Sequence, residues 1–239
     1  MEISYPYICS SQSEIPKEAL EHLGKEIVEK LGSSFRDIFP QFAQIFRLTS
    51  EAIEKNWSTP KVVLKKGIRK NIWLSFIVVQ TNNKNLFFDL QPEFMEKKGE
   101  LFNEGYEMLP ESWKELYRWF NSFVVAEESY CPMDWWNTPF SYESRINLDD
   151  YEEGSGVTRQ QTVKLAKAIG CKRDSLRCWL LTENEDALFI NEEACDGKVY
   201  HVRGKQLDVI TEILDPRKTL DEYLAHYLSG GKPADFQFS

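Results

Sequence analysis

The chain has 239 residues, a formal net charge of −9 and 42% hydrophobic residues. This composition supplies a hydrophobic core and excludes a largely disordered chain, and the length allows one large domain or two small ones. No apolar run is long enough to span a membrane, and the first residues lack the basic and apolar regions of a signal peptide. The five cysteines are odd in number and widely spaced, which is typical of a reducing compartment. We therefore expect a cytoplasmic protein without membrane association.

The first hundred residues predict helices followed by an antiparallel meander. The helices are expected over 15–31, from Pro40 onward, and from Ser50 to Trp57. Three β-rich runs separated by turn residues follow, over 62–64, 72–80 and 86–90. Together these elements predict an α+β region over residues 1–104.

The middle of the chain predicts one strong helix and then a long irregular segment. Residues 109–123 place Trp113, Leu116 and Phe120 on one helical face. Residues 124–157 show no clear period, and a loop of that length within a domain is often functional.

Three strands and a helix are predicted in the last third of the chain. The strands are expected over 176–182, 187–191 and 198–202, from apolar runs and a period of two. Thr219 with Glu222 forms a capping box for a helix that ends before Gly230, and residues 232–239 are expected to form a flexible tail. A meander covered by a helix predicts the α+β class, with a mixed or antiparallel sheet.

Three segments resemble the SUKH superfamily. LPESWKELYRWFN (109–121) is similar to its opening helix, ALFINEEACDGKVYHV (187–202) to its paired central strands, and LDPRKTLDEYLAHYLSG (214–230) to its closing helix. The resemblance covers residues 105–231 and departs from the pattern at Phe120-Asn121-Ser122, where Asn-Gly is expected. It implies a cytoplasmic immunity protein that binds and neutralises a cognate bacterial toxin. The acidic charge of the chain favours a basic toxin, for example a nuclease.

An acidic and aromatic stretch is the candidate partner-binding site. Residues 101–150 hold ten acidic and three basic residues. Buried aromatic residues supply binding energy at protein interfaces, and acidic side chains steer a basic partner. The candidate residues are Glu127, Glu128, Trp135, Trp136, Asp149, Asp150, Glu152 and Glu153. An equally open interpretation is that the tryptophans belong to the core and the acids are solvated.

The alternative function is DNA binding through a helix-turn-helix at residues 162–181. Ala166, Gly170 and Leu176 have the spacing of that motif. Residues 159–177 carry six basic residues against one acid, which is the pattern of a phosphate-contacting surface. The same residues equally suit a solvated helix followed by a strand, and the acidic charge of the whole chain disfavours nucleic acid.

Catalytic and cofactor motifs are absent from the sequence. It contains no nucleophile elbow, no metalloprotease motif, no phosphate-binding loop and no dinucleotide fingerprint. Cys171, Cys178, Cys195 and His201 do not have the spacing of common zinc modules. We therefore expect a protein without enzymatic activity and without a cofactor or metal. The oligomeric state is left open by the sequence.

Overall fold

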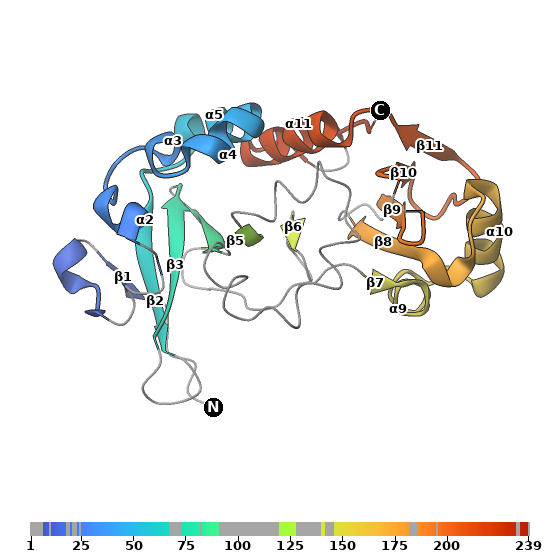
Figure 1. Cartoon of the computed structure of the whole chain (residues 1–239), viewed down its shortest axis with the longest axis horizontal. Helices are drawn as coiled ribbons and strands as arrows, with labels where there is room; N and C mark the ends of the chain where they lie inside the picture. Colours follow the sequence, from blue (N-terminus) through green and yellow to red (C-terminus); the bar gives the residue numbers. More distant parts are fainter. Residues whose placement is uncertain are drawn as a thin grey trace.

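The computed structural model shows an α+β protein with two antiparallel sheets. Helices α3, α4, α5 and α11 form a row along the top of the molecule in the view of Figure 1. The structure describes residues 7–9, 11–17, 20, 23, 25–66, 73–81, 83–90, 120–127, 140–141, 146–181, 186–194, 196–232 and 235–238. The predicted α+β class is confirmed, and all strand pairs in both sheets are antiparallel.

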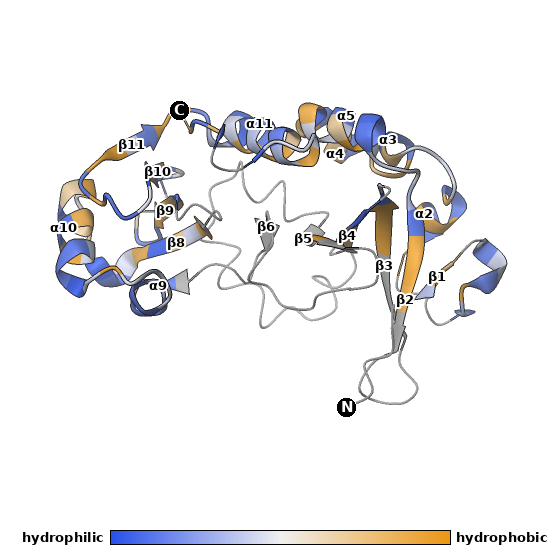
Figure 2. Cartoon of the chain, turned by 180° about the vertical axis from the view of Figure 1, so that it is seen from behind, coloured by the Kyte–Doolittle hydropathy of each residue, from blue (hydrophilic) through white to orange (hydrophobic). Residues whose placement is uncertain are grey.

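The first sheet has six strands in the order in which they occur along the chain. They are β1 (Tyr7–Ile8), β2 (Lys61–Lys66), β3 (Trp73–Gln80), β4 (Lys84–Leu90), β5 (Phe120–Glu127) and β6 (Phe140–Ser141). Successive side chains of a strand point to opposite faces, so the apolar run of β3 serves two clusters. Ile77 and Val79 face the main core, whereas Val78 packs in a small cluster with Val63 and Phe87. Figure 2 shows β2 and β3 carrying the hydrophobic colour. The predicted meander is confirmed as β2, β3 and β4.

Helices rich in phenylalanine cover one face of this sheet. The elements before β2 are η1 (Gln12–Glu14), α2 (Lys25–Glu29), α3 (Phe35–Ile38), α4 (Pro40–Ile45) and α5 (Arg47–Asn56). Phe35 contacts Phe88 of β4 at a ring-centroid distance of 5.2 Å, and Phe42 stacks on Phe46 at 5.0 Å. Helix α5 begins at Arg47, earlier than predicted. Ser50, the predicted cap, is instead a buried residue within the helix.

The second sheet has five strands and is covered on both faces. They are β7 (Ile146–Asn147), β8 (Leu176–Leu181), β9 (Ala187–Asn191), β10 (Val199–Val202) and β11 (Ile210–Ile213), in the order β11-β10-β9-β8-β7. On one face the sheet packs against α11 (Pro216–Leu228) through one hydrophobic cluster. On the other it packs against α9 (Leu148–Ser155) and α10 (Arg159–Ile169) through another, and the short η4 (Arg173–Ser175) connects α10 to β8. The three strands predicted over 176–202 are confirmed as adjacent antiparallel strands.

Helix α11 begins one turn before the predicted capping box. Asp215 caps it by accepting a hydrogen bond from the Lys218 amide at 3.0 Å, and Pro216 occupies the first turn. This arrangement suits proline, whose missing N–H is not needed there. Leu220, Tyr223 and Leu224 are buried as predicted, and the helix ends before Gly230 in the left-handed conformation.

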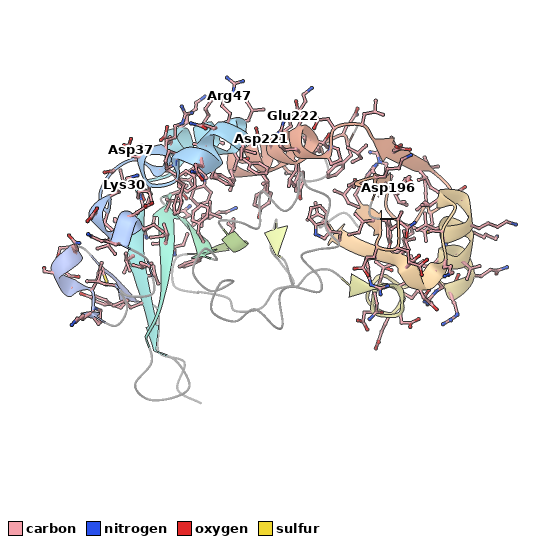
Figure 3. All side chains as sticks on the ribbon, viewed as in Figure 1. Lys30, Asp37, Arg47, Asp196, Asp221 and Glu222 are labelled. Atoms are coloured by element: carbon pink, nitrogen blue, oxygen red, sulfur yellow. The ribbon has the colours of Figure 1, made fainter. Side chains whose placement is uncertain are left out.

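Helices α11 and α5 join the two sheets into one core. The largest hydrophobic cluster contains residues of both sheets, among them Phe88 of β4 and Trp179 of β8, together with Leu224 of α11. Figure 3 shows Asp221 where α11 meets α5. The Asp221 carboxylate accepts hydrogen bonds from the amides of Leu48 at 3.0 Å and Thr49 at 2.8 Å.

Two expectations about the middle and the end of the chain need correction, those for residues 109–123 and for residues 232–239. Residues 120–123 of the predicted 109–123 helix belong to β5, where Phe123 pairs with Phe88 of β4; residues 109–119 lie outside the described residues. Because β5 and β6 complete the first sheet, the sheets divide between Ser141 and Ile146, whereas the boundary predicted at residue 104 lies outside the described residues. The expected flexible tail contains Phe238, which is buried against the His201 ring at a centroid distance of 4.8 Å.

Candidate protein-binding surface

The predicted binding residues divide between two parts of the fold and a part outside the described residues. Glu128, Trp135 and Trp136 are not among the described residues. Glu127 is the last residue of β5 in the first sheet, where it pairs with Lys84. The other four acids, Asp149, Asp150, Glu152 and Glu153, lie together on α9 beside the second sheet. The candidate surface among the described residues is therefore α9.

Helix α9 replaces part of the irregular segment predicted over 124–157. The Asn147 side chain caps it by accepting hydrogen bonds from the amides of Asp149 and Asp150, both at 2.9 Å. Gly156 ends it in the left-handed conformation with φ of 69°. These are ordinary start and stop signals, and two acids in the first turn favour the positive end of the helix dipole. The sequence therefore contains start and stop signals for this helix, although the segment has no clear apolar period.

Helix α9 is held against the second sheet by apolar side chains beneath its acidic residues. Leu148 and Tyr151 are buried, and the Tyr151 ring makes an edge-on contact with Phe189 of β9 at 5.3 Å. A short helix fixed in this way presents its remaining side chains in set directions. The acids of α9 thus belong to an anchored helix rather than to a loop.

Arg173 of η4 neutralises part of the acidic charge of α9. Its Nη2 lies 2.5 Å from Asp149 Oδ1 and 2.6 Å from Glu152 Oε1, and its side chain is only 10% exposed. Glu152 also accepts a hydrogen bond from the Thr162 hydroxyl of α10. Burial opposes the charge of Arg173, but the hydrogen bonds from Glu152 and Asp149 outweigh it and raise the pKa of Arg173. Glu152 is therefore a structural residue that ties α9 to α10 and η4.

Three acids of α9 remain at the surface. The Asp149 side chain is 68% exposed although it is paired, and Asp150 and Glu153 are exposed. Asp150 accepts a hydrogen bond from Asn147 Nδ2 at 2.7 Å. Within the part of the chain that the structure describes, neither Asp150 nor Glu153 forms an ion pair with a cation. These three carboxylates form what we call the α9 acidic surface.

The basic residues expected to contact DNA are mostly paired with acids of the same chain. Arg159 pairs with Asp149 at 3.4 Å, Lys172 with Glu193 at 3.2 Å and Arg177 with Glu192 at 3.1 Å. The helix-turn-helix interpretation is also wrong in its second helix. After α10 the chain turns at Gly170, forms η4 and enters β8, a buried strand that pairs with β7 and β9.

No metal site is formed by the cysteines and histidines that the structure describes. Cys178 is fully buried in β8, and burial alone raises the pKa of its thiol. His201 in β10 lies 3.8 Å from Asp186. No group of three or more potential ligand side chains occurs among the described residues. Of the described cysteines, Cys9, Cys171 and Cys178 are free thiols.

Comparison with known proteins returns no match for this chain, whether to a protein family, to a curated protein or to a solved structure. In the described part of the chain, every helix is too short or too polar to cross a membrane.

Proposed function

We propose that the protein is a non-catalytic immunity protein that binds a cognate basic toxin in the cytoplasm and neutralises it. The observation that carries the proposal is the α9 acidic surface, on which Asp149, Asp150 and Glu153 face solvent from a helix fixed by buried anchors. The resemblance to the SUKH superfamily supplies the class. Two of its three segments coincide with the β9–β10 pair and with α11.

The physics of association favours such a surface. Acidic groups on an already formed helix need no backbone reordering when a basic partner arrives, so the conformational entropy lost on binding is reduced. Their field also raises the association rate, an effect that added salt weakens. Trp135 and Trp136 remain the predicted apolar anchors of the complex, and they would govern its dissociation.

The first test is protection in cells. Candidate toxins encoded beside the gene of this chain are expressed in a sensitive host, with and without the protein. We expect co-expression to restore growth with one of them. If growth is restored with none of them, the proposed function is wrong.

The second test locates the surface on the protecting pair. Asp150→Lys with Glu153→Lys reverses two charges that make no ion pair among the described residues, so the fold should persist. We expect association with the toxin to slow by about tenfold at low salt, and its salt dependence to flatten.

The matched control is Glu26→Lys with Glu29→Lys, in which Glu29 makes an exposed ion pair with Lys25 at 3.6 Å that contributes little to stability. Both residues are exposed on α2, at the opposite end of the molecule from α9 in Figure 1, and the change in net charge is the same. We expect a smaller effect on the association rate from this control. Equal effects of the two variants would show that net charge matters and that α9 is not the binding surface.

A further inference from the structure

Strand β11 is an edge strand bordered by exposed aliphatic side chains. Among the described strands it pairs with β10 alone, so one side of its main chain has no strand partner. Val209, just before the strand, is 54% exposed, and Leu214, just after it, is 90% exposed. An edge strand of this kind is a template for pairing with another strand.

The sequence of β11 is compatible with pairing to a second copy of itself. A two-fold axis that relates two antiparallel edge strands is perpendicular to the sheet, and we consider the registers in which it passes midway between one residue and the same residue of the second copy. Centring the axis on Glu212 would place two glutamates opposite each other. Centring it on Ile210 would place Asp208 opposite Glu212 of the other copy. Both registers oppose like charges, which is destabilising.

Centring the axis on Thr211 avoids both conflicts. Thr211 then lies opposite its own copy, and Val209 lies opposite Ile213 of the second molecule. Leu214 is diagonal to Ile210, which is half-buried, within reach of a long side chain. The register therefore covers both exposed aliphatic residues at once. The carboxylate of Glu212 is already paired within its own sheet, with Lys198 at 3.2 Å.

We propose that β11 pairs antiparallel with β11 of a second copy of this chain, centred on Thr211, and joins two five-stranded sheets into one. The order β11-β10-β9-β8-β7 places β11 at one edge and β7, which leads directly into α9, at the other. The dimer therefore leaves the α9 acidic surface of each copy free. This inference does not depend on the proposed function, because it concerns the opposite edge of the sheet.

Sedimentation equilibrium of the full chain tests the dimer, over concentrations from about 1 µM to 1 mM, because a pairing of this size gives a weak interface. We expect a reversible monomer–dimer equilibrium. Thr211→Lys places like charges opposite each other at the axis, so it should raise the dimer dissociation constant at least about tenfold. Thr211 is exposed, so the melting temperature should be unchanged at a low concentration where both proteins are monomeric.

Cysteine crosslinking tests the register independently. Directly opposed residues have Cα atoms about 4.5–5.5 Å apart, which suits a disulfide, whereas diagonal residues lie about 7–8 Å apart. Under mild oxidation Thr211→Cys should crosslink to its own copy, and Glu212→Cys should stay at the background of the unsubstituted protein. A monomer at every concentration without crosslinking, a dimer that Thr211→Lys leaves intact, or equal crosslinking by Glu212→Cys would each overturn the proposal.

Discussion

Asp221 is the residue that most directly links the two halves of the chain. The residue before helix α5 is Phe46, which has no side-chain oxygen to cap the helix. The Asp221 carboxylate takes this role by accepting hydrogen bonds from the amides of Leu48 and Thr49 in the first turn of α5. Asp221→Ala leaves the buried Thr49 amide and the half-buried Leu48 amide without this acceptor, so we expect a loss of about 1–3 kcal/mol in the free energy of unfolding, measured in urea. Glu222→Ala is the matched control, since Glu222 is exposed enough for its ion pair with Lys218 at 3.7 Å to contribute little. Equal losses from both variants would contradict the capping role.

His201 makes the stability of the protein depend on pH. Burial lowers the pKa of His201 below its ordinary value of 6.5, against the opposing effect of Asp186. The folded state therefore favours the neutral ring. The stability that this provides is fully present above the pKa that His201 has in the unfolded chain, and it is lost as the pH falls through that value toward the lower pKa of the folded state. We expect the melting temperature to fall between pH 7.5 and pH 5.5, and to fall less in His201→Gln. His226→Gln serves as the control, and a steeper fall in His201→Gln than in the parent would show the opposite sign.

At the scale of elements, the sequence patterns predicted those helices and strands that interactions between residues near in sequence determine. The alternation over 176–202 and the helical spacing around Leu224 were sufficient for β8, β9, β10 and α11. Strand β5 was missed because an amphipathic helical pattern runs into it, and its state is decided by pairing with β4. The contacts of Arg173 with Asp149 and Glu152 join residues that are 24 and 21 positions apart, which no sequence period reveals.

The replacement of the second helix by β8 leads to a prediction about nucleic acid. Lys164 and Lys167 are the exposed basic residues of α10 that remain to contact a phosphate backbone. Without a recognition helix, and with a net charge of −9, we expect no salt-sensitive binding to duplex DNA in a gel-shift assay. A shift at low salt that disappears with added salt and with Lys164→Glu plus Lys167→Glu would restore the DNA-binding function.

At the scale of the whole molecule, the two regions that the sequence predicts separately share one hydrophobic core in the structure. No signal in the sequence indicated that α11 would pack on α5 as well as on its own sheet, because an apolar helical face does not specify its partner. The Trp57 indole donates a hydrogen bond to the Leu228 carbonyl at 2.9 Å, and Leu224 belongs to a cluster shared by both sheets. Two sheets with a common core should unfold together.

Amide hydrogen exchange can test this cooperativity, with Leu224→Ala as the perturbation. Leu224 is fully buried, so the truncation should lower the free energy of unfolding by about 2–5 kcal/mol. If the sheets form one cooperative unit, the most protected amides of β3 and of β9 should lose this same amount. Val163→Ala, at a 48% exposed position on α10, should change neither set measurably. Loss of protection in β9 with β3 unchanged would mean that each sheet unfolds separately, and that the shared cluster adds little to the stability of the first sheet.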